Sequence, residues 1–488
     1  MPDILQQLSD AGYEATIGLE IHVQLNTRSK IFSSDSNEET EESNTHISVI
    51  SIGHPGTLPV LNKVAVQKAV LMGLACGSDI TRNNYFDRKS YFYPDLPKGY
   101  QTTQDKTPIC VGGSIPLTGE GLLQQTVSLH HIHLEEDAGK SIHDEGDSTL
   151  IDLNRAGTPL IEMVTNPCIK GPDEAAACLQ EIRRMVRYLG IGNANMEKGE
   201  LRCDANISIK KKDSEILGSK VEIKNMNSFN HVRRAAFYEL ERQLALKLNN
   251  EVIEVETRTY DPVQGKTYGM RFKETMNDYR YFPCPDLPPL AIEESFIEGL
   301  QEASRVQPAT FRKKFAEHYQ LSDYDINILT EEKETALYFD ALCQWVEDKK
   351  VAANWMNGPV RALINETNQT LEDLNLSSAR LAELIQMVDS GKVVYKTAVQ
   401  QLLPELLKSN QSATKLAQDL NMMVEEDAGA LDAVIREVLV SLPKEVEAYR
   451  NGKKKLMGLF MGEVMKRSRG KANPKDVQTA LNKALSNL

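Results

Sequence analysis

The hydrophobic period of this chain changes near residue 290, and this change limits the accessible folds more than any other feature of the sequence. Before that point, runs with an apolar residue at every second position alternate with turn clusters and a few helical segments. Segment 278–292 is rich in proline, which ends regular elements. From about residue 300 the apolar spacing is helical and strand signals almost vanish. The sequence therefore predicts an α+β part followed by an all-α part.

Segment 15–25 shows the strand pattern most clearly, because its apolar and polar residues alternate throughout. Such a period of two is typical of a strand with one buried face. The polar face carries Glu20 and His22, where a solvated strand would more often show Thr, Lys or Ser. Segment 126–137 changes phase at His130–His131, which indicates a β-bulge.

Similar alternation predicts further strands at 158–165, 200–210, 220–224 and 251–260. For 251–260 we expect a solvated outer face. Segment 171–190 has the punctuation of a helix, with Pro172 at its start and Gly190 after its end. Together these elements predict an antiparallel sheet backed by helices, with one polar working face.

Carboxylates recur on the polar side of the predicted strands, at Glu20, Glu135, Glu162 and Asp204. Taken singly, each strand is explained by a solvated face, and Glu162 by a buried ion pair with an arginine. If the acids converge, like charges about 5 Å apart repel by roughly 3 kcal/mol per pair at an effective dielectric of about 20. A divalent cation would remove that repulsion. Oxygen ligands with the imidazole of His22 suit Mg²⁺ or Mn²⁺ better than zinc.

Nucleotide binding through a P-loop is excluded, because GxxxxGK[ST] does not occur in the sequence. Segment 85–104 combines Arg88, Lys89 and Lys98 with several aromatic residues and two prolines. Such a segment is either a well-packed surface loop or an ordered loop that presents cations to phosphate and aromatic rings to a base.

The net charge of −13 makes the chain acidic, so nucleic-acid binding requires a local basic patch. Residues 450–475 hold nine Lys or Arg against one acid, Glu463, and form either a solvated face or an RNA-binding surface. The seven cysteines include no CxxC pair, which fits a reducing cytoplasm. The first residues lack signal-peptide features. The longest apolar run, 69–77, is too short to span a bilayer, so no membrane partner is expected.

Seven stretches, in order along nearly the whole chain, resemble the GatB/GatE family, whose bacterial members are the B component of the aspartyl/glutamyl-tRNA(Asn/Gln) amidotransferase. They are IGLEIHVQL, SYFYPDLPKGYQTTQ, HLEEDAGKS, DLNRAGTPLIEMVTNP, LRCDANIS, VEIKNMNSF and DYRYFPCPDLPPL. The resemblance implies three domains. A catalytic cradle similar to glutamine synthetase and guanidino kinases covers residues 1–299, an all-α helical domain covers 300–425, and a small all-α, YqeY-like tail domain that binds tRNA covers 426–488.

The resemblance also implies an activity. Members of this family use ATP and Mg²⁺ to phosphorylate the side-chain carboxylate of mischarged Glu-tRNA(Gln) or Asp-tRNA(Asn). Ammonia then displaces the phosphate, which gives Gln-tRNA(Gln) or Asn-tRNA(Asn). The ammonia comes from an amidase, the A component of a GatCAB heterotrimer, which the small C component joins to the B component. This chain shows no amidase pattern of its own. Whether Glu-tRNA, Asp-tRNA or both are substrates stays open.

The matching motifs imply roles for three groups of residues. The metal-binding group is Glu20, His22, Glu135 and Glu162, and Asp204 joins them as a catalytic residue. The segment that resembles the family's phosphate and ammonia-path loop contains Lys89, Tyr91 and Asp95. The tRNA-binding residues of the tail are Lys453, Lys454, Lys455, Lys466, Arg467 and Lys471.

The sequence departs from the family pattern at two places. Some members carry a four-cysteine zinc site early in the chain, but the matching region here has no cysteine, so no structural zinc is expected. Cys284 stands where an acid is usual. Two other functions stay open: a small-molecule carboxylate or guanidino kinase, which needs no tRNA, and a non-enzymatic RNA-binding adaptor with a cation-stabilised sheet.

The basic tail gives a testable prediction. Replacing Lys453, Lys454 and Lys455 together by Gln removes three positive charges, so we expect weaker tRNA binding with a smaller dependence on salt. ATP binding in the absence of tRNA should not change. Filter binding of tRNA at several salt concentrations measures the effect, and an unchanged tRNA affinity in the triple variant contradicts the prediction.

Overall fold

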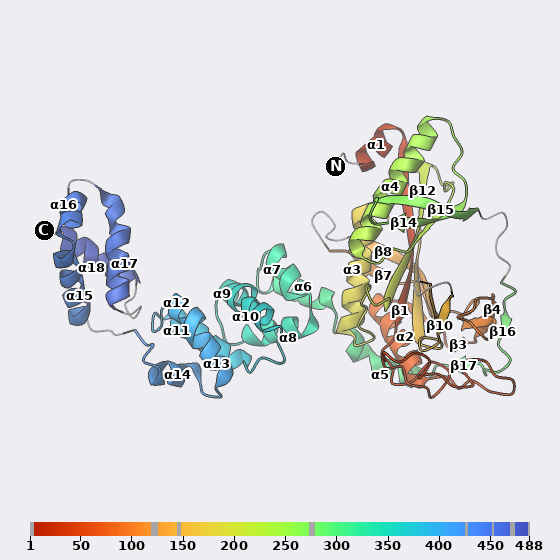
Figure 1. Cartoon of the computed structure of the whole chain (residues 1–488), viewed down its shortest axis with the longest axis horizontal. Coiled ribbons are helices and arrows are strands. Elements are labelled where there is room, and N and C mark those ends of the chain that lie inside the picture. The colour runs from red at the N-terminus through yellow and green to blue at the C-terminus, as the bar shows by residue number, and fades with distance from the viewer. Residues whose placement is uncertain are drawn as a thin grey trace. The chain divides into compact units, whose positions relative to one another are not determined.

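The computed structural model divides the chain into two compact units, residues 1–310 and 311–488 (Figure 1). The described residues are 4–118, 125–143, 148–272, 279–424, 428–450, 453–468 and 474–486.

A ten-stranded sheet forms the centre of the first unit, in the order β15-β14-β13-β12-β1-β11-β8-β6-β2, with β7 paired to β8. Its strands are β1 (Tyr13–Gln24), β2 (Asp79–Ile80), β6 (Cys110–Val111), β7 (Ser114–Pro116), β8 (Thr126–Glu136), β11 (Pro159–Thr165), β12 (Leu201–Lys211), β13 (Val221–Lys224), β14 (Glu256–Asp261) and β15 (Lys266–Phe272). Smaller sheets pair β9 (Lys140–Ile142) with β10 (Leu150–Asp152), β3 (Asn83–Asn84) with β17 (Leu290–Ala291), and β4 (Asp87–Ser90) with both β5 (Tyr100–Thr103) and β16 (Phe282–Pro283).

The large sheet is mixed, which corrects the antiparallel sheet predicted from the sequence. Its paired strands are antiparallel except for β13 and β14, which run parallel. A parallel pair needs a crossover connection, and the 20-residue helix α4 (Phe229–Leu248) supplies it. Alternation along each strand predicts which residues share a face but not the direction of its neighbours.

Helices cover the apolar face of the sheet. They are α1 (Ile4–Asp10), α2 (Lys63–Cys76), α3 (Pro172–Tyr188), α4 and α5 (Glu294–Ser304), and Figure 1 shows α3 and α4 lying along the sheet. The predicted helix at 171–190 is confirmed. Ile17, Leu19, Ile21 and Val23 of β1 are at most 1% exposed and belong to the core. The other face of β1 keeps its polar side chains partly exposed, so this face is available for chemistry.

The phase change in 126–137 is a β-bulge, as the sequence predicts. Val164 lies opposite His131, but the next residue, Thr165, lies opposite Leu129, so His130 has no opposite residue on β11. The bulge places His133 and Glu135 on the polar face of the sheet while Leu134 stays in the core.

The solvated outer face expected for 251–260 is wrong. The strand begins only at Glu256, and Glu256 and Arg258 lie in a buried ionic network beneath α4. Arg258 is 2.8 Å from Glu256, and Arg242 of α4 is 3.1 Å from Glu256. The helix brings its own charged residues to the strand, and an alternating pattern cannot distinguish such a surface from solvent.

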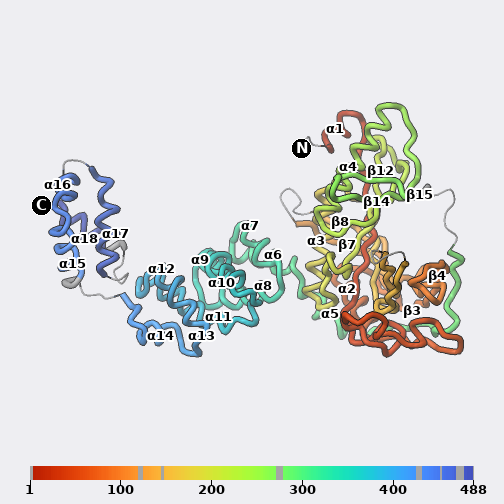
Figure 2. The backbone as a smooth tube through the Cα atoms, viewed as in Figure 1, coloured from red at the N-terminus to blue at the C-terminus, as the bar shows by residue number. Residues whose placement is uncertain are grey.

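Between β1 and α2, residues 25–62 form a long, mostly irregular segment (red in Figure 2). Asn62 caps α2 by accepting a hydrogen bond from the backbone of Val64. This segment approaches β4 and β5, because residues from all three line one cavity.

The described residues of the second unit contain helices and no strand, as the sequence predicts for this region. Its helices are α6 (Pro308–Glu317), which begins just before the unit boundary, α7 (Asp323–Leu329), α8 (Lys333–Leu342), α9 (Lys349–Trp355), α10 (Arg361–Thr367), α11 (Ser378–Asp389), α12 (Tyr395–Thr397), α13 (Leu403–Lys408), α14 (Ala413–Asp419), α15 (Ala428–Ser441), α16 (Pro443–Arg450), α17 (Met457–Arg467) and α18 (Pro474–Ser486). The last helices enclose a core of their own around Phe460, Val464 and Leu481. The domain boundaries at 299 and 425 stay predictions. Among the described residues, no helix has the length and apolarity needed to cross a membrane.

The network beneath α4 gives a stability prediction. Glu239 is fully buried and accepts hydrogen bonds from Arg242 at 2.7 Å, Gln243 at 2.9 Å and Thr267 at 3.1 Å. Because Glu239→Gln leaves buried arginine charge uncompensated, we expect the free energy of unfolding in urea to fall by about 3 kcal/mol. Glu241→Gln, on the same helix, should change it by less than about 0.5 kcal/mol. Equal effects of the two substitutions contradict this account.

Candidate functional site

Three neighbouring strands place imidazoles and carboxylates side by side on the polar face of the sheet. His22 of β1 lies opposite Glu162 of β11, and Glu162 lies opposite His133 of β8. Glu135 follows two residues later on β8 and therefore points to the same face. Directly opposite side chains on a sheet have Cβ atoms about 5 Å apart, so these four residues can interact. We call His22, His133, Glu135 and Glu162 the acid–imidazole cluster.

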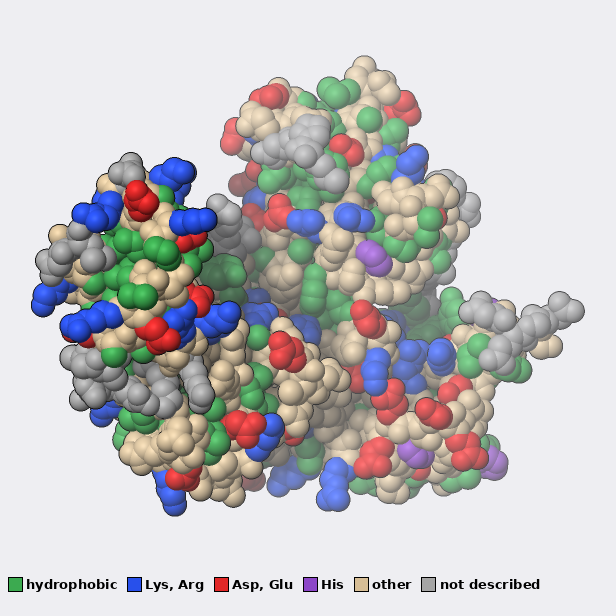
Figure 3. All heavy atoms as spheres, turned by 60° about the vertical axis from the view of Figure 1, so that its left-hand side comes forward, with side chains coloured by type: hydrophobic (Ala, Val, Ile, Leu, Met, Phe, Trp, Pro, Cys, Tyr) green, Lys and Arg blue, Asp and Glu red, His purple; other side chains and the backbone are tan. Residues whose placement is uncertain are grey.

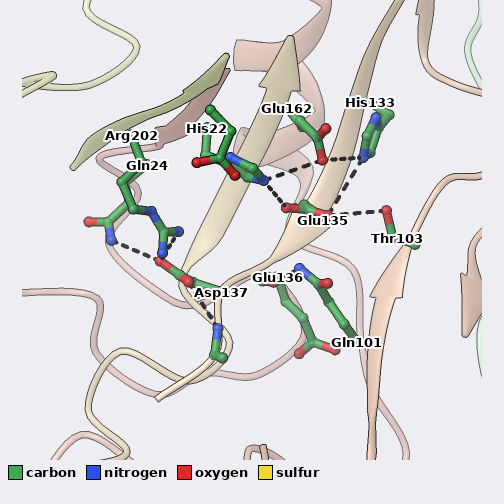
Figure 4. A network of polar contacts seen from close by, with 12 residues as sticks. His22, Gln24, Gln101, Thr103, His133, Glu135, Glu136, Asp137, Glu162 and Arg202 are labelled. Carbon is green, nitrogen blue, oxygen red and sulfur yellow. Dashed lines mark hydrogen bonds and ion pairs between the residues drawn. The ribbon is translucent and has the colours of Figure 1, made fainter. Parts of the chain in front are cut away.

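The cluster is held by close contacts between rings and carboxylates (Figure 4). His22 Nε2 lies 3.4 Å from Glu135 and 3.3 Å from Glu162. His133 Nε2 lies 3.3 Å from Glu162 and 3.6 Å from Glu135. Thr103 of β5 also donates its hydroxyl to Glu135 at 3.3 Å. Glu135 is only 2% exposed, so its carboxylate depends on these partners for its stabilisation.

Mutual charge sets the protonation states in the cluster. Burial alone would lower the pKa of His22, but the charge of Glu162 and hydrogen bonds to Glu135 and Glu162 raise it to about 10. The same balance raises the pKa of His133 to about 9. Burial pushes the pKa values of both carboxyl groups upward, yet the two imidazoles hold them below the usual range. Two ionised acids therefore lie next to two protonated rings.

His133 was missed as a site residue by the sequence analysis, although its position on the polar face was visible there. The expected arginine partner of Glu162 is replaced by the two histidines. Charge repulsion between buried acids is thus compensated by imidazoles in the described structure, and a divalent cation could supply the same compensation. His22, Glu135 and Glu162 each offer one ligand atom, and these atoms lie within 4.8 Å of one another.

Glu20 and Asp204 lie opposite each other on β1 and β12, on the same face as His22. Glu20 accepts a hydrogen bond from Asn206 at 2.8 Å, and Asp204 is paired with Lys224. Neither belongs to the group of ligand atoms within 4.8 Å. Their predicted metal-binding and catalytic roles therefore stay predictions.

The predicted phosphate and ammonia-path residues lie on or just after β4. Burial lowers the pKa of Lys89, but the charges of Glu135 and other acidic groups raise it above its ordinary value, so this ammonium acts on the cluster. Tyr91 donates its hydroxyl to Gln101 at 3.3 Å, and burial raises its pKa. Asp95 accepts a hydrogen bond from Ser141 at 3.1 Å, which ties its loop to β9.

Comparison with known proteins places this site in a described family. Residues 15–298 match the model of the GatB/GatE catalytic domain, and residues 337–485 match that of the GatB domain. Curated relatives, each named as the B subunit of aspartyl/glutamyl-tRNA(Asn/Gln) amidotransferase, are 43% identical over 473 residues in Chlorobium chlorochromatii and 42% identical over 480 residues in Azotobacter vinelandii. Each alignment covers 97% of this chain and 99% of the relative.

The chain belongs to the GatB family. The resemblance drawn from seven sequence motifs is thereby confirmed. The acid–imidazole cluster and Lys89 fall inside the part that matches the catalytic domain, and the basic tail falls largely inside the part that matches the GatB domain.

A second feature of this GatB-family catalytic domain is a cavity of about 470 Å³ near residues 50–59. It is lined by Lys30, Lys98, Glu136 and Cys284, among others. Glu136 is paired with Lys98 and accepts a backbone hydrogen bond from Thr102 at 2.8 Å. Burial lowers the pKa of Lys30 to about 8. Sequence analysis missed Lys30 because it lies in a segment without regular period.

The third group of predicted residues lies in the tail of this GatB-family chain. Lys453, Lys454 and Lys455 are exposed before and within the short helical turn that leads into α17, and Lys466 is partly exposed near the end of α17. Arg467 instead contacts Glu437 at 3.1 Å. Lys471 lies outside the described residues. Figure 3 shows Lys and Arg side chains around a hydrophobic area on the visible face of these helices.

Proposed function

We propose that this chain is the synthetase subunit of a tRNA-dependent amidotransferase. It transfers the terminal phosphoryl group of ATP to the side-chain carboxylate of Glu-tRNA(Gln), Asp-tRNA(Asn) or both. Ammonia then replaces the phosphate and forms the amide. The observation that carries this proposal is the acid–imidazole cluster, which lies within the segment that matches the GatB/GatE catalytic domain.

The residues of the cluster fit a magnesium site. Glu135 and Glu162 supply hard oxygen donors and His22 supplies one nitrogen, which suits Mg²⁺ or Mn²⁺. When bound, such an ion neutralises charge on a transferring phosphoryl group. His133 contacts both carboxylates and would fix their orientation from the side. Glu20, two residues before His22 on β1, is the further ligand that the family resemblance implies.

The chemistry explains why the cluster is buried. A carboxylate is a poor acyl donor, whereas an acyl phosphate is a good one that water also attacks. Glu135 and His133 are 2% and 8% exposed, so the floor of the site excludes water. Lys89 brings a positive charge to the same place, where it would bind phosphate oxygens. Positioning and charge neutralisation are the main requirements of phosphoryl transfer.

The same proposal assigns partners and a shared architecture. The relatives are named as one lettered component of an amidotransferase, which supports a heterotrimer with an amidase (the A component) and a small linking protein (the C component). The exposed lysines of the tail would bind tRNA phosphates. We also infer a cytoplasmic location. The polar sheet face would act as the phosphoryl-transfer surface does in glutamine synthetase and guanidino kinases.

The test uses the complex of this chain co-expressed with the other two components from its host. We expect ATP hydrolysis and amide formation to require Glu-tRNA(Gln) or Asp-tRNA(Asn), each assayed separately by analysis of the released amino acid. Glu135→Gln removes a buried charge at the reacting centre and should lower the rate by about 100-fold or more. Glu241→Gln serves as the matched control and should keep full activity.

Two results would contradict the proposed function. ATP consumption that is independent of mischarged tRNA but active on a free carboxylate would identify a small-molecule kinase. Binding of tRNA without any ATP consumption would identify an adaptor.

A further inference from the structure

Two segments far apart in the sequence bring six aromatic side chains together beside the acid–imidazole cluster. They are Tyr91, Phe92, Tyr93, Tyr279, Tyr281 and Phe282. Strand β16 pairs with β4, so that Phe282 lies opposite Arg88, and Figure 1 shows these two strands side by side. The backbone amide of Ser90 also donates to the carbonyl of Tyr279 at 2.9 Å. The aromatic segments are therefore fixed to each other by main-chain hydrogen bonds.

The rings support one another through edge-to-face contacts. The centroid of Tyr91 lies 6.0 Å from that of Tyr93 and 6.2 Å from that of Tyr279, which in turn lies 6.0 Å from that of Tyr281. Phe92 lies over Gly99, whose φ is 72° and where an added Cβ would come within 3.0 Å of the ring. These contacts hold the rings in defined positions.

Four of these rings are nevertheless open to solvent. Phe92 is 86% exposed, Tyr93 58%, Phe282 45% and Tyr281 39%. We call these four residues the aromatic platform. Large aromatic surfaces seldom stay exposed in a group unless they bind something, and flat rings of this kind stack on nucleobases.

Lys89 connects the aromatic platform to the acid–imidazole cluster. Its ammonium lies 5.0 Å from the ring centre of Tyr279. Its charge acts on the hydroxyl of Tyr281 on one side and interacts with Glu135 and Glu162 on the other. A ligand that stacks on the platform would thus have a cation beside it and the acidic site beyond the cation.

We propose that the aromatic platform binds the adenine ring of ATP by stacking. The order of groups fits a nucleoside triphosphate: rings for the base, the Lys89 ammonium for the phosphate chain, and the carboxylates of the cluster at its reacting end. This inference rests on the proposed use of ATP by this chain. The adenosine at the 3′ end of tRNA shares the same base chemistry, so the experiment separates the two sources.

The experiment measures dissociation constants of ATP and of inorganic tripolyphosphate for the complete complex, in the presence of Mg²⁺. Tyr93→Ala and Tyr281→Ala remove stacking rings, and Tyr281→Phe keeps the ring. Tyr324→Ala, on α7 of the other unit and 73% exposed, is the matched control. Unchanged melting temperatures show that the variants fold.

We expect each alanine variant to weaken ATP binding by about tenfold, because a lost base stack has an effect of this order. Tripolyphosphate binding should not change, and Tyr281→Phe and Tyr324→Ala should bind ATP like the unsubstituted chain. The KM for ATP in amide formation should rise in parallel while kcat changes little.

Three results would overturn the assignment. ATP affinity could stay the same in the Tyr93→Ala, Tyr281→Ala double variant. ATP and tripolyphosphate could weaken equally, which would point to a structural or charge effect. Finally, the alanine variants could lose only the preference for tRNA over tRNA shortened by its terminal adenosine, which would assign the platform to tRNA. Failure of the proposed function would look different, because the unsubstituted complex would then not consume ATP with any mischarged tRNA.

Discussion

Two carboxylates buried next to each other need positive charge at short distance, and the first unit of this protein is organised around that need. Glu135 and Glu162 receive it from His22 and His133 on adjacent positions of the sheet. The strand register makes this arrangement possible, because a shift of one residue would turn these side chains into the apolar core. The β-bulge at His130 serves the same end by bringing His133 and Glu135 into phase with their neighbours.

This arrangement links the fold to the proposed chemistry. A face that concentrates ionised acids and shields them from water is suited to hold a divalent cation and the polyphosphate that the cation accompanies. The apolar residues on the opposite face of β1 anchor the strand under the helices, so the polar residues do not have to stabilise the fold themselves. The described helices of the second unit contain no comparable cluster of ligand atoms. Their exposed lysines suit contact with a polyanion.

The sequence predicts the local part of this structure well. Period-two alternation identifies β1 and its buried face, a phase change identifies the bulge, and proline and glycine mark the ends of α3. What fails depends on residues distant in the chain. The parallel pairing of β13 with β14 follows from the crossover through α4, and the burial of Glu256 follows from charges on that helix. Likewise, alternation gives the face of Glu20 and His22, but only the neighbouring strands show that His22 meets two acids while Glu20 meets Asn206.

The most direct test of this account is to locate a bound ion. Crystals of the protein grown with Mn²⁺ should show an anomalous scattering peak between His22, Glu135 and Glu162, and crystals of the Glu135→Gln variant should lose it. A peak elsewhere, for example between Glu20 and Asp204 alone, or no peak on the polar face of the sheet at saturating Mn²⁺, would contradict the claim that the acid–imidazole cluster is the metal-binding centre.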